Sequence, residues 1–336
     1  MLPSEPKIFH GRDSEVSDIL KAFAQETPRI AILGAGGMGK TSLARAVLHH
    51  PTITARYLQN RVFVACDSVS TTVALAALIG SHVGLKPGRD LTRSVVQHFS
   101  SGPASLLVLD NLESIWESVQ NRRAIEEFLS NLTEVSHLAL IITMRGAEQP
   151  AKVHWTRPFL LPLQPLSYNA AYQTFTDITE DNHDTNNIDK ILHLTGNMPL
   201  AIDLIAHLVD YEGCSAVLTR WDSEKTALLS EGSDRRSNLE ISISLSLSSP
   251  RILALPNAKD LLGLLSILPD GLSEVVLLQS KIPIQNILSC RAVLLRTSLA
   301  YIDDQKHLKA LVPIREYMQT LHHPPDRLIQ PLLKHF

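Results

Sequence analysis

Residues 34–41 read Gly-Ala-Gly-Gly-Met-Gly-Lys-Thr and fit the pattern G-x-x-x-x-G-K-[ST] at every fixed position. A strand-like run at 29–33 precedes them, and residues 42–48 have the apolar spacing of a helix. Glycines in such a turn let successive backbone N–H groups approach phosphate oxygens, because no Cβ blocks the approach. A strand, a glycine-rich turn and a helix in this order predict a phosphate-binding loop, and the alternative is a turn that binds nothing.

Within this phosphate loop (residues 34–41) the side chains have distinct expected roles. Lys40 is expected to place its charge on the β- and γ-phosphates, and Thr41 to give its hydroxyl to Mg²⁺. The helix that opens at Gly39 and Lys40 adds its positive N-terminal end. The predicted nucleotide-binding residues here are Gly34, Ala35, Gly36, Gly37, Met38, Gly39, Lys40, Thr41 and Ser42.

Apolar strand-like runs alternate with helical patterns from residue 28 to about 161, which indicates a parallel α/β sheet. The predicted strands are 30–33, 62–66, 106–109, 138–143 and 159–161, and the predicted helices are 41–49, 71–83, 92–99 and 123–132. From about residue 167 helices dominate, at 188–194, 200–209 and 261–268, with a polar loop expected at 231–237. Residues 239–247 alternate with period two, which favours a strand, but their place among helical segments leads us to predict a helix.

Polar residues follow two of the predicted strands. Asp110 ends the run 106–109 and is expected at the carboxyl edge of the sheet, where open α/β sheets bind ligands. Its carboxylate suits Mg²⁺, which prefers oxygen ligands, although Asp110 and Asn111 could also be an ordinary turn. Thr143 and Arg145 end the next strand, and a guanidinium suits phosphate oxygens. Taken alone, Arg145 is better explained as a solvated residue at the end of a strand.

Composition limits the function classes. The net charge of −3 and the pI of about 6.5 give no field that would draw the chain to nucleic acid or acidic membranes. Three isolated cysteines fit a reducing compartment rather than a disulfide framework or a zinc site. The N-terminus lacks the apolar core of a signal peptide, and no apolar run reaches transmembrane length. We therefore expect a cytoplasmic chain with no membrane partner.

Further motifs accompany the phosphate loop and together resemble a known family. Residues 8–13 read Ile-Phe-His-Gly-Arg-Asp, and residues 196–201 read Gly-Asn-Met-Pro-Leu-Ala. With Asp110 and the Thr143-x-Arg145 strand end between them, they resemble the STAND class of signal-transduction NTPases. The likeness is greatest to the NB-ARC/NACHT-like switch proteins of cell-death and immune receptors, especially large fungal members. It covers nearly the whole chain.

The resemblance assigns further residues and a domain order. It implies that Phe9, Gly11 and Arg12 help to close the adenine pocket, that Pro199 and Leu200 touch the base, and that Thr143 and Arg145 sense the γ-phosphate. It also implies three domains. These are a P-loop α/β domain at 1–163, an α-helical lid at 164–250 and a winged helix at 251–336.

The implied activity is an ATP- and ADP-binding switch with Mg²⁺ as cofactor and Lys40, Asp110, Glu113 and Arg145 as catalytic residues. Asn111 stands where many family members have a second acid, and an amide cannot take a proton from water. Glu113 is the candidate base instead, so we expect slow hydrolysis. Ala310-Leu311-Val312 stands where plant and animal members have Met-His-Asp, which implies a weaker or different ADP-locked state.

Other readings remain. The resemblance covers neither an effector nor sensor repeats, so we expect a fragment of a longer protein, a regulator of longer paralogues, or a core that recruits partners in trans. A homo-oligomer or a complex with a paralogue would form through the nucleotide domain. A second interpretation is an AAA+ type ATPase or an initiator that binds DNA through a winged helix. The acidic net charge disfavours DNA binding. A metabolic P-loop kinase and a non-enzymatic scaffold with an idle loop are further alternatives.

Overall fold

The computed structural model describes residues 2–25, 27–86, 88–118, 120–179, 183–230, 238–303 and 305–333. It divides into two units. The first unit is Met1–Gly34 with Gly39–Leu163, and the second is Ala35–Met38 with Gln164–Phe336. The polar loop expected at 231–237 lies outside the described residues.

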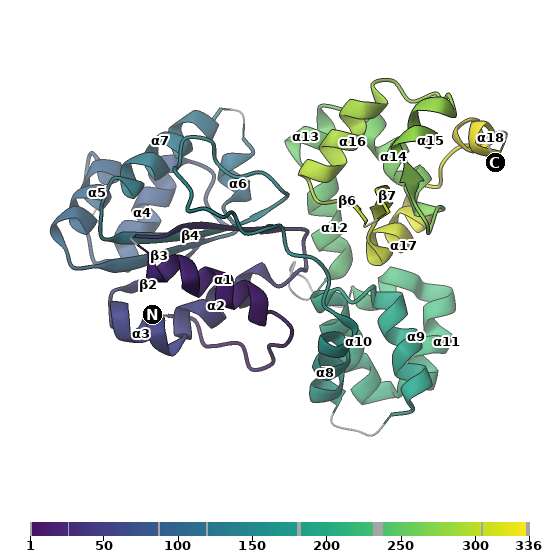
Figure 1. Cartoon of the computed structure of the whole chain (residues 1–336), viewed down its shortest axis with the longest axis horizontal. Helices are drawn as coiled ribbons and strands as arrows, with labels where there is room; N and C mark the ends of the chain where they lie inside the picture. The colour runs from purple at the N-terminus through teal and green to yellow at the C-terminus, as the bar shows by residue number, and fades with distance from the viewer. Residues whose placement is uncertain are drawn as a thin grey trace. The chain divides into compact units, whose positions relative to one another are not determined.

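A parallel four-stranded sheet forms the centre of the first unit (Figure 1). Its order is β1 (Arg29–Gly34), β4 (Leu138–Arg145), β3 (Ser105–Asp110) and β2 (Arg61–Ala65). The register pairs Gly34 with Arg145 and Ala65 with Asp110, so the carboxyl ends of the strands meet at one edge. Strands β3 and β4 are buried over almost their whole length, which explains why they read as continuous apolar runs.

Helices cover both faces of this sheet (Figure 1). One face carries α1 (Asp13–Ala24), α2 (Lys40–His49) and α3 (Pro51–Tyr57), and the other carries α4 (Thr72–His82), α5 (Leu91–Ser101), α6 (Glu113–Trp116) and α7 (Arg122–Thr133). The apolar core on the second face joins the strands to α4, α5 and α7. The four strands and four helices predicted between residues 30 and 143 are thus confirmed, with ends shifted by at most two residues.

The fifth predicted strand, 159–161, is wrong. The described chain there forms no strand and makes a single isolated bridge, between Gly34 and Leu163. Pro158 and Pro162 flank the run and have no N–H to donate to a ladder. Phe159 and Leu161 are 46% and 80% exposed, so this apolar run is not a buried strand.

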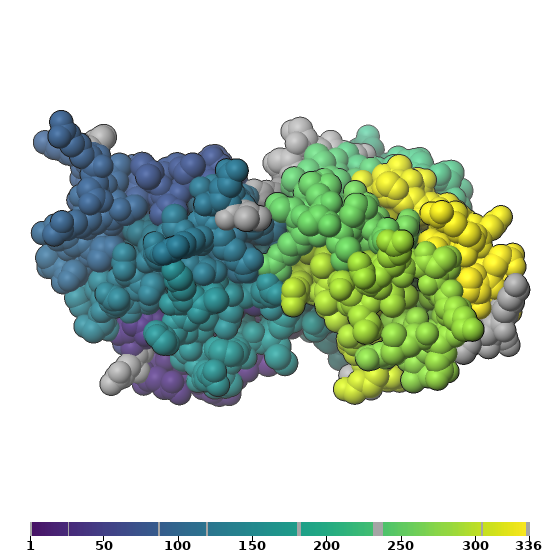
Figure 2. Space-filling view, turned by 90° about the horizontal axis from the view of Figure 1, so that it is seen from above, coloured from purple at the N-terminus to yellow at the C-terminus, as the bar shows by residue number. Residues whose placement is uncertain are grey.

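The second unit is mainly helical. It contains α8 (Tyr168–Thr179), α9 (Thr185–Thr195), α10 (Pro199–Glu212), α11 (Cys214–Glu224), η1 (Lys225–Leu229), α12 (Leu239–Leu247), α13 (Pro250–Leu253), α14 (Asn257–Ser266), α15 (Glu274–Gln279), α16 (Ile287–Arg296), α17 (Val312–Leu321) and α18 (Asp326–Leu333). Three short strands, β5 (Leu272–Ser273), β6 (Ala300–Ile302) and β7 (His307–Ala310), form an antiparallel sheet in the order β5-β7-β6. The last residues of this unit that the structure describes are yellow in Figure 2.

Two predictions about this unit are confirmed. The predicted helices 188–194 and 200–209 lie inside α9 and α10, and 261–268 overlaps α14. Residues Leu239–Leu247 form helix α12 despite their period-two pattern. Asn238 caps it by accepting a hydrogen bond from the Ile241 N–H at 2.9 Å. The Ser244 and Ser246 hydroxyls donate back to the carbonyls of Ile241 and Ser242, which keeps them satisfied within the helix.

In the part of the chain that the structure describes, no helix has the length and apolarity needed to cross a bilayer.

Candidate functional site

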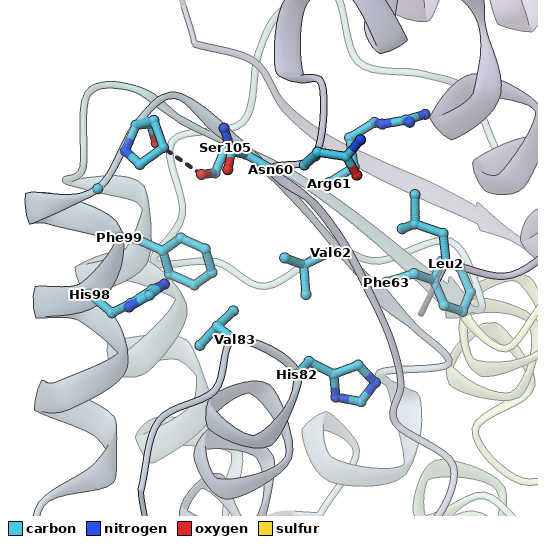
Figure 3. Close-up of a pocket in the computed structure, with 13 residues that line it drawn as sticks. Leu2, Asn60, Arg61, Val62, Phe63, His82, Val83, His98, Phe99 and Ser105 are labelled. Atoms are coloured by element: carbon cyan, nitrogen blue, oxygen red, sulfur yellow. Dashed lines mark hydrogen bonds between the residues drawn. The ribbon is translucent and has the colours of Figure 1, made fainter.

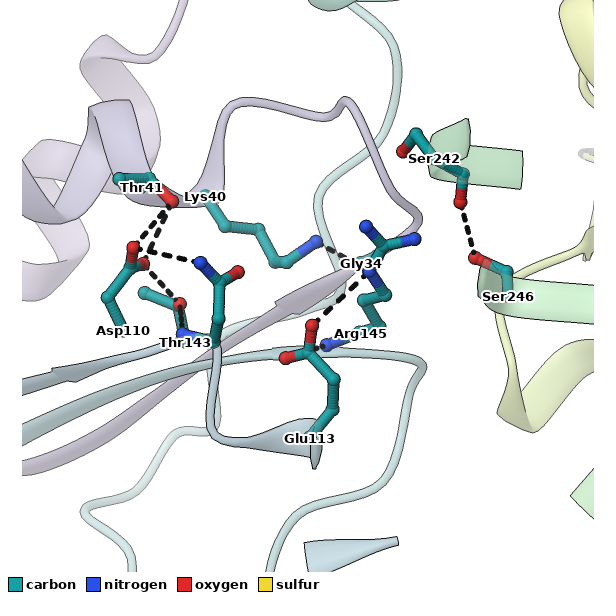
Figure 4. Close-up of polar contacts among 10 residues, drawn as sticks. Gly34, Lys40, Thr41, Asp110, Glu113, Thr143, Arg145, Ser242 and Ser246 are labelled. Carbon is teal, nitrogen blue, oxygen red and sulfur yellow. Dashed lines mark hydrogen bonds and ion pairs between the residues drawn. The ribbon is translucent and has the colours of Figure 1, made fainter. Parts of the chain in front are cut away.

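The phosphate loop connects β1 to α2 at the carboxyl edge of the sheet (Figure 4). Three of its glycines have positive φ, +146° at Gly34, +80° at Gly37 and +81° at Gly39, so a side chain at these positions would strain the backbone. Helix α2 begins at Lys40, which is 6% exposed. Its Nζ donates a hydrogen bond to the Gly34 carbonyl at 3.0 Å, so the ammonium group lies back across the loop.

Asp110, at the end of β3, is fully buried and is held by several donors. The Thr41 hydroxyl lies 2.8 Å from Oδ1 and 3.1 Å from Oδ2. The Thr143 hydroxyl donates to Oδ1 at 2.6 Å, and Asn111 Nδ2 to Oδ2 at 3.2 Å. The two predicted metal ligands, Thr41 and Asp110, are therefore in direct contact (Figure 4).

Thr143 and Asn111 fix the orientation of this carboxylate. Thr143 is fully buried, donates to Asp110, and accepts a hydrogen bond from the Asn111 backbone N–H at 2.9 Å. Asn111 has φ +60°, a left-handed conformation that asparagine tolerates better than most residues. The left-handed backbone conformation after β3 thus favours Asn at position 111, where many members of the resembled family have a second acid.

Glu113 and Arg145 lie beside this network and contact each other. Glu113 begins the short helix α6, and Arg145 ends β4. Arg145 Nε lies 3.2 Å from Glu113 Oε1, and the Arg145 backbone N–H donates to Oε2 at 3.3 Å. The two side chains are only 11% and 8% exposed, so the pair is largely removed from water. The structure brings together two residues that sequence reasoning treated separately.

The segment before α1 carries the predicted residues Phe9, Gly11 and Arg12. Phe9 is half-buried, and Gly11 adopts φ +68°. Arg12 is buried, and its Nη1 donates to Glu15 Oε1 at 2.9 Å. Whether these three residues contact a nucleotide base stays a prediction.

In the second unit, the predicted residues Pro199 and Leu200 begin α10 and lie against the middle of the phosphate loop. The Leu200 N–H donates to the Gly37 carbonyl at 3.1 Å. A Cβ at Gly37 would lie 3.0 Å from Leu200 Cβ and 3.2 Å from Met198 Sδ. Gly37 is therefore required by a close approach as well as by its φ. Sequence reasoning missed Met198, although it lies inside the quoted Gly-Asn-Met-Pro-Leu motif.

A cavity of about 380 Å³ lies elsewhere in the first unit (Figure 3). Its lining includes residues at the amino ends of β2 and β3, such as Asn60, Arg61 and Ser105, together with His82 and Phe99. The phosphate loop, Asp110 and Arg145 are at the opposite, carboxyl ends of the strands. This cavity is therefore separate from the candidate nucleotide site.

Among the comparisons with known proteins, the family match covers mainly the first unit of this chain. Residues 2–152 match the family model described as Novel STAND NTPase 1. The putative disease resistance protein RGA4 of Solanum bulbocastanum is 30% identical over 118 residues, which is 32% of this chain and 12% of the relative. Disease resistance protein RGA2 of the same plant is 29% identical over 131 residues, 36% of this chain and 13% of the relative. The matched segments span only a small part of these relatives.

Two solved structures share the fold. The Walker-type ATPase PABY2304 of Pyrococcus abyssi has a TM-score of 0.65 at 14% identity, over 95% of this chain and 98% of the other. The Orc1 protein of Aeropyrum pernix, solved in complex with DNA, has a TM-score of 0.52 at 14% identity, over 97% and 95%. At this identity the likeness concerns the fold alone. With the family match and the loop geometry, the nucleotide-binding part of this chain is a STAND-class P-loop NTPase.

Proposed function

We propose that this chain binds ATP and ADP with Mg²⁺ at the phosphate loop and acts as a nucleotide-operated switch with slow hydrolysis. One observation carries this proposal, namely the contact between the Thr41 hydroxyl and the Asp110 carboxylate at 2.8 Å. A hydroxyl and a carboxylate are oxygen ligands of the kind that Mg²⁺ prefers, and Lys40 begins the same helix as Thr41. ATP rather than GTP follows from the family resemblance.

The residues present fit a magnesium ion. Asp110 and Thr41 would hold it, and Thr143 and Asn111 would keep the carboxylate oriented through their hydrogen bonds to it. A bound Mg²⁺ would neutralise charge on the phosphates. Lys40 would bind the β- and γ-phosphates, and the N–H groups of residues 34–39 would surround them.

Slow hydrolysis is the expectation because neither of the two residues considered for the role of base, Asn111 and Glu113, is ready to accept a proton from water. Asn111 is an amide, and its Nδ2 donates to Asp110. Glu113, the candidate base, has both carboxylate oxygens in contact with Arg145. General-base catalysis needs an accessible acceptor within hydrogen-bond reach of the water.

The finer parts of the proposal concern the second unit. We assign residues 164–250 to a helical lid and 251–336 to a winged helix, because α14, β5, α15, α16, β6 and β7 follow one another in the order that a winged helix has. The hydrogen bond from Leu200 to Gly37 supports a coupling between loop and lid. A ligand that binds one conformation of the loop more tightly would then shift the lid as well.

The wider role is proposed from the same resemblance. It comprises a cytoplasmic location, no membrane or nucleic-acid partner, and association with a second copy or a longer paralogue through the nucleotide domain. Association with a second copy or a longer paralogue would make the switch a regulator rather than a metabolic enzyme.

Calorimetry with ATP and ADP in the presence of Mg²⁺ tests the binding site. The wild type is expected to bind both, and Lys40→Ala is expected to lose at least about tenfold in affinity because a buried charge beside the phosphates is gone. Lys21→Ala, which removes an exposed lysine from α1, is the matched control and should bind as the wild type does. Equal and negligible binding by wild type and Lys40→Ala would disprove the proposal. It would favour the alternative of a non-enzymatic scaffold whose phosphate loop binds nothing.

Single-turnover release of γ-phosphate tests the catalytic assignment. Glu113→Gln is expected to abolish release, and Asn111→Ala to preserve it. Unchanged release by Glu113→Gln would remove Glu113 from the mechanism while leaving nucleotide binding in place.

A further inference from the structure

Glu113, the candidate base, and Arg145, which the resemblance makes a sensor of the γ-phosphate, contact each other. Glu113 Oε1 lies 3.2 Å from Arg145 Nε, and Oε2 accepts the Arg145 backbone N–H at 3.3 Å (Figure 4). Helix α6 has only four residues, so Glu113 is placed by the turn after β3 rather than by a long helix. Strand β4 delivers Arg145 to the same edge, next to Gly34 in the register.

Burial makes this contact energetically significant. At 11% and 8% exposure the two charges have lost most of their hydration, so each stabilises the other. Taking Glu113 away from Arg145 weakens the compensation of a buried cation, which is more costly than doing so at an exposed one. A group that displaces Glu113 is therefore favoured if it is itself an anion.

The γ-phosphate of a nucleoside triphosphate is such an anion. A diphosphate has no γ-phosphate to place beside Arg145. Gly34, the first residue of the phosphate loop, pairs with Arg145 across β1 and β4, so the guanidinium begins at the edge where the phosphates are proposed to bind. Phosphate oxygens match the donors of a guanidinium at least as well as a carboxylate does. Glu113 and a terminal phosphate thus compete for one cation.

On the basis of the proposed nucleotide function, we propose that Glu113 is a specificity-determining residue that weakens ATP binding by pairing with Arg145, and that the γ-phosphate displaces it. ADP binding leaves the pair intact, so the pair favours the diphosphate state. Displacement also separates the Glu113 carboxylate from Arg145. Binding of the triphosphate would thereby make the candidate base available to a water molecule. A ligand can shift such an equilibrium only through its different affinity for the two states, and here that difference is the γ-phosphate.

The test compares ADP with a non-hydrolysable ATP analogue by calorimetry in Mg²⁺. Glu113→Gln is expected to raise the affinity for the analogue by about tenfold, within the range of typical coupling between sites, and to leave ADP affinity unchanged. Arg145→Gln is expected to weaken analogue binding, with little change for ADP. In the double variant the gain from Glu113→Gln should disappear, because the two residues act through one contact. Glu134→Gln, an exposed acid in the same unit, is the control and should change neither affinity.

Several results would overturn the competition. They are an equal change for both nucleotides in Glu113→Gln, a weaker analogue complex, or a gain that persists in the double variant. If the wild type binds both nucleotides and Glu113→Gln changes nothing, this inference fails and the proposed function stands. If the wild type binds neither, both fail.

A second variant covers the case in which Glu113→Gln does not fold. Glu113→Asp keeps the charge but shortens its reach, so it is expected to raise analogue affinity by a smaller factor than Glu113→Gln. Analogue affinity equal to that of the wild type, in a folded Glu113→Asp variant, would also contradict the proposal.

Discussion

Glu15 shows how a single carboxylate in this chain is stabilised. The Ser14 hydroxyl donates to Oε2 at 2.6 Å, and Arg12 Nη1 donates to Oε1 at 2.9 Å. Partial burial opposes ionisation of Glu15, but these hydrogen bonds and the charge of Arg12 outweigh it, and the pKa of Glu15 is lowered. Because the folded pKa lies below the unfolded one, ionisation of Glu15 stabilises the fold at neutral pH.

Glu15→Gln is therefore expected to reduce the free energy of unfolding at pH 7 by up to about 1 kcal/mol, since the pair is partly exposed. The difference is fully present above the unfolded pKa of about 4.5 and is lost as the pH falls through the folded pKa. Urea unfolding of both proteins across acid and neutral pH measures it. Asp18→Asn, which removes an exposed pair with Lys21 on the same helix, is the control and should change little. A difference that grows in acid would contradict this account.

At this scale the sequence pattern places Lys40, Thr41 and Asp110 in one site, and the structure does bring them to one edge. It could not show that Glu113 and Arg145 form a pair. They are 32 positions apart, and their contact depends on the register of β3 with β4 and on the turn at Asn111. Neither the register nor a left-handed φ has a clear signal in a single sequence.

Among the elements, α9 and α17 meet at a position that leaves no room for a side chain. Gly196 ends α9 with φ +56°. A Cβ there would lie 2.9 Å from Val312 Cβ, at the first residue of α17. Val312 belongs to the segment that replaces the Met-His-Asp of plant and animal relatives. The apolar contact at Gly196 is thus made by the residue that the resemblance aligns with the Asp of that motif.

Gly196→Ala is expected to destabilise the chain by about 1–3 kcal/mol, because the methyl group adds both backbone strain and a clash with Val312. Gly213→Ala is the matched control, since Gly213 also has a positive φ, +83°, but nothing lies within 4 Å of an added Cβ. Thermal unfolding should show a larger loss for Gly196→Ala. Val312→Ala in the same chain should recover part of it, and equal losses at the two glycines would disprove the clash.

The predicted strands and helices are confirmed where the apolar spacing and the burial agree. The predicted strand at 159–161 is wrong because of the residues that flank it. The strands of the sheet are apolar and buried, so their runs were clear. Pro158 and Pro162, which have no N–H to donate, prevent a strand at 159–161 although its residues are apolar. Among the helices that were not predicted are α1, α3, α8 and α11. Ile19 and Phe23, four residues apart and both buried, were a usable signal for α1, whereas α3 has only seven residues.

For the molecule as a whole, the fold likeness to a DNA-bound Orc1 raises the question of DNA binding. In helix-turn-helix proteins the second helix enters the major groove, and α16 is the corresponding helix of the proposed winged helix. Its Leu288 is 48% exposed, and its Arg291 pairs with Glu274 at 3.3 Å. With a net charge of −3, the chain lacks the excess of basic residues that phosphate contacts need.

We therefore expect no salt-dependent binding to a duplex of about 20 base pairs. Fluorescence anisotropy with a labelled duplex, at low and physiological salt and with ATP or ADP present, measures it. Micromolar or tighter binding that weakens steeply with salt would contradict the prediction and favour the initiator-like alternative.

The domain boundaries at 163 and 250 stay predictions, because a change in composition marks them only broadly.

Helix α12 has a consequence for the chain before it folds. In the folded unit, capping by Asn238 and the serine hydroxyl contacts hold residues 239–247 as a helix. Without those contacts, Leu-Glu-Ile-Ser-Ile-Ser-Leu-Ser-Leu has the alternation, the β-branched residues, the low charge and the absence of proline that are typical of amyloid-forming segments.

A peptide of residues 239–247 is therefore expected to form thioflavin-positive β-sheet fibrils, and the same peptide with Ile243→Lys to remain soluble. In the full chain, slow refolding should produce aggregates that contain this segment. A soluble, unstructured wild-type peptide would refute the expectation. If the wild-type peptide does form fibrils, a largely buried helix of the native protein is a source of aggregation whenever synthesis or unfolding exposes it.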